Sequence, residues 1–196
     1  MNSSLKYDLD FTSENAPKKG TLLISNPEMP DKIFNRSVIL LCEHNETGTL
    51  GFILNKRSMT FLNELIEDFD DIPEKLYYGG PVDMNSLYIL HKSDLIKESN
   101  FVIDDIKYGG NIDNLSSLYN TSQLTHDDIK FCLGYSSWIP NQLEFEIQRK
   151  SWITYDNVDS NLIFLSEPED MWKNVLNTMG NKYKIYANYP KDASLN

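Results

Sequence analysis

The chain has 196 residues, with 40% hydrophobic and 12% aromatic side chains, which suits one packed domain and excludes a disordered polypeptide. It carries 18 basic against 29 acidic side chains, for a formal net charge of −11. This charge, together with the scattering of the few basic pairs, argues against direct contact with nucleic acid, whose phosphates demand a basic surface.

Residues 1–19 are polar and weakly patterned, and we expect a flexible N-terminal arm ahead of one domain over residues 20–196. Apolar runs predict a strand over residues 21–25 and a hairpin over residues 38–54. The first hairpin strand is apolar on both faces, so it should be a central strand that is covered on each side. The turn at residues 45–48 ends in a glycine, which can adopt a positive φ.

Several elements are predicted in the middle of the chain. The spacing of apolar residues over residues 61–69 indicates a helix with one buried face. Strands are expected over residues 86–91, 100–111 and 129–135, the second of which ends in a Gly-Gly turn. A short helix is expected over residues 112–120.

The segment after Pro140 combines one helix with two short strands. Proline is favoured in the first turn of a helix, and Leu143 and Ile147 should face the interior from it. Two short apolar runs then follow, over residues 151–155 and 161–165, and we interpret both as strands.

A capping box at residues 166–169 marks the start of the last predicted helix, which ends at Gly180 and precedes an expected edge strand over residues 183–189. Helices in the whole chain are too few and too irregularly placed for βαβ units, and the early hairpin fixes an antiparallel pair. We therefore predict an α+β fold. It would be a single domain with a mixed, curved and partly barrel-like β-sheet and three to four flanking helices.

Three separated stretches carry a family resemblance: LLISNPEMPDKIFNRSVILLCEHNETGTLGFILNK, YYGGPV…LYILH and LGYSSWIPNQLEFEIQRKSWI. In this order they resemble the AlgH family, also called UPF0301, YqgE or DUF179, over residues 20–180. The resemblance implies a bacterial protein with one compact AlgH-like domain, and a family name that refers to transcriptional regulation. It implies neither an established enzyme reaction nor a DNA-binding motif. The acidic arm and the segment IKYGGNIDNL depart from shorter members.

Cys42 and His44 are the first candidate pair for chemistry. In a regular strand, side chains two residues apart share a face at roughly 6.6 Å, as a nucleophile with its base or two metal ligands would. The apolar run before Cys42 favours a buried and inert core thiol instead. His44 and Asn45, at the corner of the hairpin, are expected to bond to loop backbone.

Gly79 and Gly80 form a glycine-rich turn, which can cradle a phosphate when it opens a helix. Neither a GxxxxGK[ST] nor a GxGxxG motif is present, so a turn where another backbone approaches closely is favoured. His91 ends the strand that follows, where it would either join His44 around a pocket or form a local hydrogen bond.

Ser136, Ser137 and Trp138 lie between a predicted strand and a predicted helix, the position of a nucleophile elbow. The second glycine of GxSxG is missing. A loop serine that forms hydrogen bonds and a tryptophan that anchors packing are therefore the favoured interpretations, although such loops are also common binding sites.

These patterns favour a non-enzymatic binding or regulatory module that contacts a protein or a small molecule, without direct nucleic acid or membrane contact. The alternative is a small hydrolase or thiol-dependent enzyme that uses Cys42 with His44, or Ser136 with Ser137. No cofactor or metal is expected, and the absence of a secretory signal and of a CxxC pair predicts a cytoplasmic protein. The candidate binding surface comprises His44, Asn45, Gly79, Gly80, His91, Ser136, Ser137 and Trp138.

Overall fold

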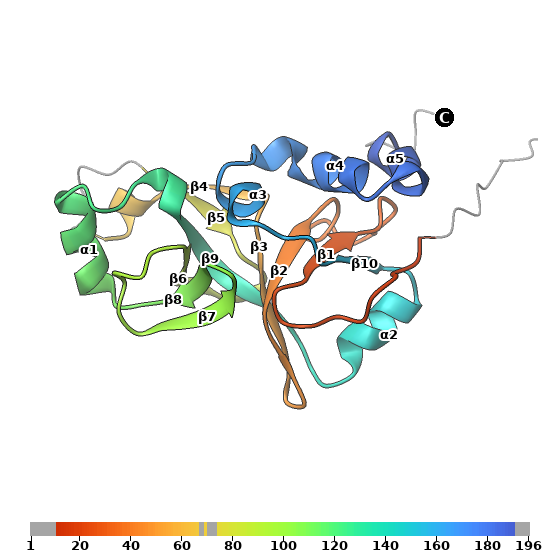
Figure 1. The fold of residues 1–196 in the computed structure, drawn as a ribbon, viewed down its shortest axis with the longest axis horizontal. Helices are drawn as coiled ribbons and strands as arrows, with labels where there is room; N and C mark the ends of the chain where they lie inside the picture. Colours follow the sequence, from red (N-terminus) through yellow and green to blue (C-terminus); the bar gives the residue numbers. More distant parts are fainter. Residues whose placement is uncertain (1–10, 67–68, 70–73, 191–196) are drawn as a thin grey trace, which may run out of the picture.

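A computed structural model of the protein describes residues 11–66, 69 and 74–190 (Figure 1). The strands are β1 (Leu22–Ser25), β2 (Val38–Asn45), β3 (Gly48–Ile53), β4 (Arg57–Phe61), β5 (Lys75–Tyr78), β6 (Val82–His91), β7 (Ser99–Ile103), β8 (Ile106–Gly109), β9 (Ile129–Trp138) and β10 (Trp152–Tyr155). The α-helices are α1 (Ile112–Asn120), α2 (Gln142–Gln148), α3 (Ser160–Phe164), α4 (Pro168–Thr178) and α5 (Asn181–Ala187). Short 3₁₀ helices span Leu62–Glu64 and His126–Asp128.

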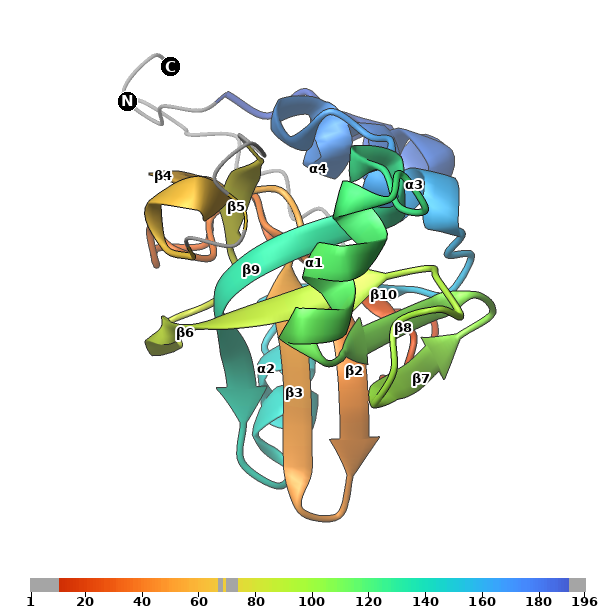
Figure 2. The same cartoon turned by 90° about the vertical axis from the view of Figure 1, so that its left-hand side faces the viewer.

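The ten strands form one sheet in the order β10-β1-β2-β3-β9-β6-β8-β7, with β4 attached through β5, which pairs with β9. The β5–β9 pair is parallel and the other pairs are antiparallel, so the sheet is mixed as predicted. Figure 2 shows the long strand β9 curving between the two halves of the sheet. The sheet does not close into a barrel, since β10 and β7 end it. The α+β class is confirmed, with five α-helices in the described ranges instead of three to four.

The predicted β2–β3 hairpin is confirmed, with Asn45 opposite Gly48 across the turn. Gly48 has a φ of 133°, and the Asn45 side chain accepts a hydrogen bond from the Thr47 amide at 2.8 Å. Successive β2 residues are buried on alternate faces of the sheet, so β2 is the doubly covered central strand that its apolar run predicted.

Gly79 and Gly80 carry the chain across β9, from β5 at one edge of that strand to β6 at the other. A Cβ atom on Gly80 would lie 2.2 Å from the Tyr135 carbonyl carbon, and one on Gly79 would lie 2.2 Å from the Gly134 oxygen. The two backbones therefore touch, which only glycine permits. This confirms that the Gly-Gly turn marks a close backbone approach.

Two predicted strands near the C-terminus are helices. Residues 161–165 fall mostly in α3, because the Asp159 side chain accepts a hydrogen bond from the Leu162 amide and so caps a helix. Residues 183–189 fall mostly in α5, where Tyr183, Tyr186 and Ala187 are buried at helical spacing. Short apolar runs do not distinguish a strand from a buried helical turn, and this caused both errors.

Three further predictions fail in their details. The single strand predicted over residues 100–111 is a hairpin, in which β7 and β8 pair antiparallel. The described part of the helix predicted over residues 61–69 contains the end of β4 and a 3₁₀ turn, because Phe61 pairs with Lys75 of β5. Residues 67–68 of that prediction lie outside the described residues. The predicted capping box is absent, since α4 begins after Glu167, whose side chain makes no capping hydrogen bond.

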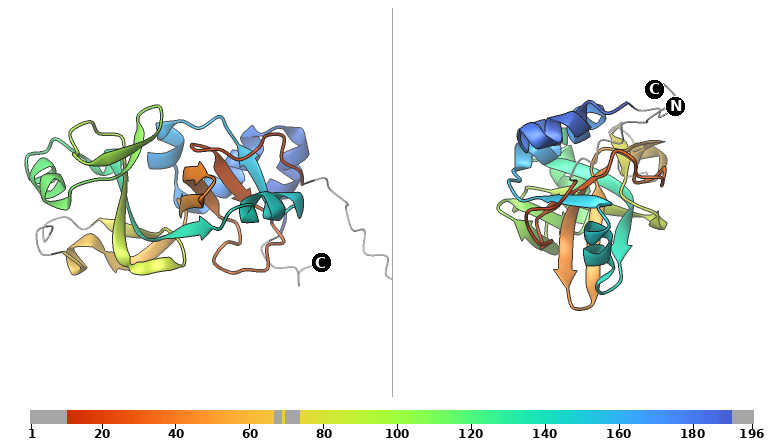
Figure 3. Two further views of the ribbon diagram at one scale, coloured as in Figure 1. Left: turned by 90° about the horizontal axis from the view of Figure 1, so that it is seen from below. Right: turned by 90° about the vertical axis from the view of Figure 1, so that its right-hand side faces the viewer.

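Three hydrophobic clusters hold the fold together. The main core lies between the sheet and α3, α4 and α5, a second cluster lies under α1, and a third lies under α2. Figure 3 shows α1 with β6 to β8 on one side of the molecule, and α2, α4 and α5 with β1 and β10 on the other. Among the described residues, no helix is long and apolar enough to cross a membrane.

Residues 11–19 of the predicted arm lie against the C-terminal part of the domain. The Phe11 ring is buried in the main core and meets the Tyr186 ring edge-on, with centroids 4.8 Å apart. The Ser13 hydroxyl accepts a hydrogen bond from the Thr154 amide of β10 at 2.7 Å. Residues 1–10 lie outside the described residues.

Candidate functional site

The end of the β2–β3 hairpin brings together part of the predicted surface: His44, Asn45, Ser137 and Trp138. Thr49 pairs with both His44 and Trp138 across neighbouring strands. The His44 ring contacts the Thr49 hydroxyl through Nδ1 at 2.7 Å and the Glu144 carboxylate through Nε2 at 3.5 Å. The polar atoms of this corner therefore bond mainly to one another.

Trp138 is a packing anchor held by Glu146 of α2. The Trp138 and Trp152 indole N–H groups donate to the same Glu146 oxygen at 3.0 and 2.7 Å, and the Gln142 amide donates to the other at 2.9 Å. One carboxylate thus ties α2 to β9 and β10, because it accepts three hydrogen bonds at once.

The structure separates Cys42 from His44. A β-bulge between Leu41 and Glu43 breaks the strand alternation, so the expectation that these two side chains share a face is wrong. Cys42 stays in the main core, and Glu43 accepts a hydrogen bond from Tyr108 on that side. His44 is turned toward α2. Burial raises the pKa of the Cys42 thiol well above its ordinary value, which leaves it unreactive.

Ser136 lies where Gly79 and Gly80 carry the chain across β9. Its buried hydroxyl donates to the Gly79 carbonyl at 3.2 Å, while Ser137, next along β9, is exposed. Adjacent residues of a strand point to opposite faces, so the two serines do not form a pair. Gly79, Gly80 and Ser136 therefore build the crossing.

His91 lies far from the hairpin corner. It pairs with Ile129 at the start of β9, whereas Trp138 ends β9, so the two sites are about 30 Å apart along the strand. The structure does not place His91 and His44 around one pocket. The His91 Nε2 contacts the Ser99 hydroxyl at 2.9 Å, and that hydroxyl donates to the Ile96 carbonyl, so Nε2 carries the proton.

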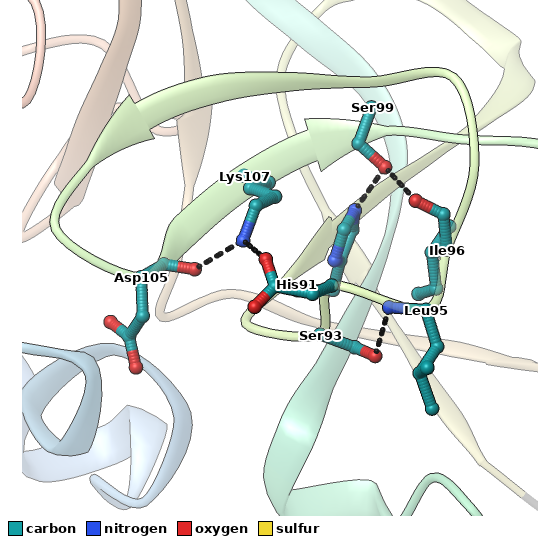
Figure 4. A network of polar contacts seen from close by, with 8 residues as sticks. His91, Ser93, Leu95, Ile96, Ser99, Asp105 and Lys107 are labelled. Carbon is teal, nitrogen blue, oxygen red and sulfur yellow. Dashed lines mark hydrogen bonds and ion pairs between the residues drawn. The ribbon is translucent and has the colours of Figure 1, made fainter.

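The other ring nitrogen of His91, Nδ1, is buried without a hydrogen-bond partner among the described residues. Burial lowers the pKa of His91 to about 4, and the positive charge of Lys107 acts in the same direction. Lys107 itself pairs with Asp94 at 2.8 Å. His91 is thus a neutral core histidine at physiological pH, and Figure 4 shows the surrounding contacts.

One cavity of about 620 Å³ lies between α4, the end of α5, the start of β2 and the end of β3. Its central guanidinium, that of Arg36, donates to the Tyr189 and Pro190 carbonyls and lies 4.7 Å from the centroid of the Trp172 ring system. Asn55 bonds to the Val38 amide and the Arg36 carbonyl. These side chains brace the fold, since their polar groups are used internally.

A second cavity, of about 460 Å³, lies where β4 and β5, the start of β9 and the loop between α3 and α4 meet. We call it the Lys130 cavity, and the lining residues that matter below are Arg57, Glu74, Lys75, Tyr77, Lys130, Phe164 and Leu165. None of them belongs to the surface predicted from the sequence. Its volume is that of an ordinary small-molecule site.

Lys130 is the unusual residue of this cavity. Its side chain is only 3% exposed, and its ammonium lies 3.8 Å from the centroid of the Tyr77 ring. No described residue forms an ion pair or hydrogen bond with that ammonium, although lysine is almost never buried without a partner. The sequence held a signal for it, because Lys130 shares a strand face with buried Cys132.

Titratable groups surround Lys130. Burial raises the pKa of the Glu74 carboxyl, which lies near His126, Asp127 and Lys130. Arg57 forms ion pairs with Glu167 and Glu169 at 3.4 and 3.5 Å. Across the described ranges, no group of three or more His, Cys, Asp or Glu side chains could hold a metal ion. The cavity thus combines a buried cation, a perturbed carboxyl and aromatic walls, a combination typical of ligand sites.

Comparison with known proteins agrees with the fold. The UPF0301 protein of Cytophaga hutchinsonii is 43% identical over 91% of this chain and 98% of its own length, and that of Chlorobaculum tepidum is 39% identical over 91% and 96%. The crystal structure of DIP2367 from Corynebacterium diphtheriae has a TM-score of 0.76 at 22% identity, over 92% of this chain and 97% of that one.

The solution structure of AlgH from Pseudomonas aeruginosa has a TM-score of 0.69 at 25% identity, over 93% of this chain and all of that one. A family model described as AlgH-like, DUF179, matches residues 22–184. The family resemblance carried by the hairpin, the Gly-Gly crossing and the end of β9 is therefore confirmed, and this chain belongs to the AlgH-like (DUF179, UPF0301) family.

Proposed function

We propose that this protein is a non-enzymatic binding module that takes a small-molecule ligand in the Lys130 cavity. The observation that carries the proposal is the buried Lys130 ammonium, which has an aromatic face but no acidic partner among the described residues. We place the ligand here and not at the hairpin corner, because the polar groups of His44 and Trp138 already bond within the fold. In the Lys130 cavity, by contrast, the N–H donors of the Lys130 ammonium have no acceptor among the described residues.

The alternative of a hydrolase or thiol-dependent enzyme has less support. Cys42 is buried with a raised pKa, and it lies on the other face of β2 from His44. Ser136 is buried and donates to a backbone carbonyl, and Ser137 has no base beside it among the described residues. Neither pair has the contact between nucleophile and base that covalent catalysis needs.

We further propose that the protein acts in the cytoplasm and that any regulatory role proceeds through ligand or protein contacts, without direct contact to nucleic acid or membrane. The net charge of −11 supports this, because electrostatic attraction to phosphate backbones needs the opposite sign. The two free, buried cysteines, Cys42 and Cys132, suit a reducing compartment.

Chemical-shift mapping tests the proposal. The ¹⁵N-labelled full chain is titrated with a metabolite library that contains acids, amines and neutral compounds. We expect binders whose largest amide shifts lie in residues 74–78, 129–132 and 164–167. Binders that instead shift only the hairpin corner, or a library without any binder at the cavity, would contradict the proposal.

A further inference from the structure

We infer that the ligand of the Lys130 cavity carries one compact anionic group, a carboxylate or a phosphate, on an apolar body. This inference rests on the proposed function and adds the chemical class of the ligand. It follows from the hydrogen-bonding state of Lys130, from its neighbouring charges and from the walls of the cavity.

The Lys130 ammonium has three N–H donors and no described acceptor. The Tyr77 ring attracts the positive charge through its face, but a ring face does not replace oxygen acceptors for three donors. Carboxylate and phosphate oxygens form short, charge-assisted hydrogen bonds with an ammonium, and these bonds are strongest where water is excluded. An anion is therefore the group that the described residues do not supply to this ammonium.

Glu74 is the acid whose position most resembles that of an internal counter-ion. Lys130 and His126 tend to lower the pKa of its carboxyl, yet burial has the largest effect and the net shift is upward. A carboxylate that is firmly paired with a lysine shows the opposite shift. The two side chains also form no ion pair, and the Lys130 ammonium lies on the Tyr77 ring instead, so Glu74 is not its paired counter-ion.

The other cations of the cavity already have partners. Arg57 pairs with two glutamates, and the exposed Lys75 lies 5.9 Å from the centroid of the Phe61 ring. Acidic side chains at the rim, Glu167 and Asp127, repel a polyanion, and the net charge of the chain does the same. One small anionic group that reaches Lys130 is favoured over nucleic acid.

The side chains that line the cavity indicate the chemistry of the rest of the ligand. The rings of Tyr77 and Phe164 and the half-exposed side chain of Leu165 line the cavity beside Lys130. These apolar groups lie beside Lys130 in a lining that is otherwise largely polar and charged, and they suit a body such as a ring, whose burial adds affinity in proportion to its area. A volume of about 460 Å³ accommodates a ring with its anionic substituent.

Four probes that share one ring test the inference. Benzoate and phenyl phosphate carry the anion, benzamide is the neutral isostere, and benzylamine carries a cation. Each is titrated into the ¹⁵N-labelled full chain, its Lys130→Met variant and its Lys75→Met variant. Lys75→Met is the matched control, because it removes the same charge from the same cavity at an exposed position.

We expect at least one of the anionic probes to bind at least tenfold more tightly than benzamide, and benzylamine to bind most weakly. Lys130→Met should weaken binding of that anion at least tenfold, and Lys75→Met less than threefold. The probe comparison on the unaltered chain stands even where a variant fails to fold. Whichever anion binds more tightly identifies the group.

Two results overturn the inference. Benzamide could bind at the cavity as tightly as both anions, or Lys130→Met could bind the anions as the unaltered chain does. In either case the cavity still takes a ligand and the proposed function survives. If no probe and no library compound shifts the amides of the cavity, both the inference and the proposed function fail.

Discussion

The ammonium of Lys130 lies 3.8 Å from the centroid of the Tyr77 ring, so among the described residues an aromatic face and no carboxylate holds this buried cation. Burial of a charge costs several kcal/mol, and a cation–π contact returns about 2 kcal/mol when it is desolvated. The folded protein therefore carries a local energetic penalty at this position. Such penalties are typical of sites that are shaped for binding.

Replacement of Lys130 by methionine should stabilise the protein. Methionine fills a similar volume without a charge, so we expect the free energy of unfolding to rise by about 1–3 kcal/mol. Urea denaturation at neutral pH measures the change. Lys75→Met, at an exposed position beside the same cavity, should stay within about 0.5 kcal/mol. A loss of stability in Lys130→Met would indicate that Lys130 supports the fold.

His91 should make the protein less stable in mild acid. Its folded pKa is lowered to about 4 from the usual 6.5, so between these values the unfolded chain binds a proton that the folded chain does not. The stability that neutral His91 retains is therefore fully present above pH 6.5. As the pH falls toward 4, the free energy of unfolding decreases by a total of about 3 kcal/mol.

Denaturation curves between pH 7 and pH 4 check this prediction. His91→Gln should remove most of this dependence, because glutamine does not titrate. Equal slopes for the unaltered chain and His91→Gln would show that His91 does not stay neutral.

Glu146 should contribute strongly to stability, unlike its neighbour Glu144. Glu146→Ala leaves two indole N–H groups without their acceptor, and we expect a loss of about 2–4 kcal/mol. Glu144→Ala removes one partly exposed contact with His44 and should cost less than about 1 kcal/mol. Tryptophan fluorescence during urea denaturation reports both, and similar losses for the two variants would refute the role assigned to Glu146.

Gly80 should tolerate no side chain. A Cβ there would lie 2.2 Å from the Tyr135 carbonyl carbon, so Gly80→Ala should cost more than about 4 kcal/mol or prevent folding. Gly180 also has a positive φ, of 108°, but a Cβ atom on Gly180 would have no neighbouring atom within 4 Å among the described residues. Gly180→Ala should therefore cost only about 1–2 kcal/mol of backbone strain. Thermal denaturation followed by circular dichroism measures both variants, and equal losses of stability would contradict the close backbone approach at Gly80.

The sequence predicted those elements that depend on local patterns. The apolar faces of β2 and the glycine at its turn were sufficient for the hairpin, and the Gly-Gly pair indicated a close backbone approach. The bulge at Cys42 was not predictable, because it depends on how β2 pairs with β3. Because of that single extra residue, the side chains of Cys42 and His44 lie on opposite faces of the sheet.

The candidate site was the least predictable part. Lys130 and Tyr77 are separated by 53 positions, and they meet because β5 and β9 pair in parallel through a crossing over β9. No local pattern reports such a pairing. The inward position of Lys130 in an apolar strand was visible in the sequence, but only the structure shows that no described acid accompanies it.

The most direct test of this account is the affinity of the unaltered chain for benzoate and phenyl phosphate, compared with that of Lys130→Met. A loss of at least tenfold for the tighter-binding anion, with amide shifts centred on the starts of β5 and β9, is the predicted result. Unchanged affinity in Lys130→Met, or binding that leaves the cavity amides unshifted, would contradict it.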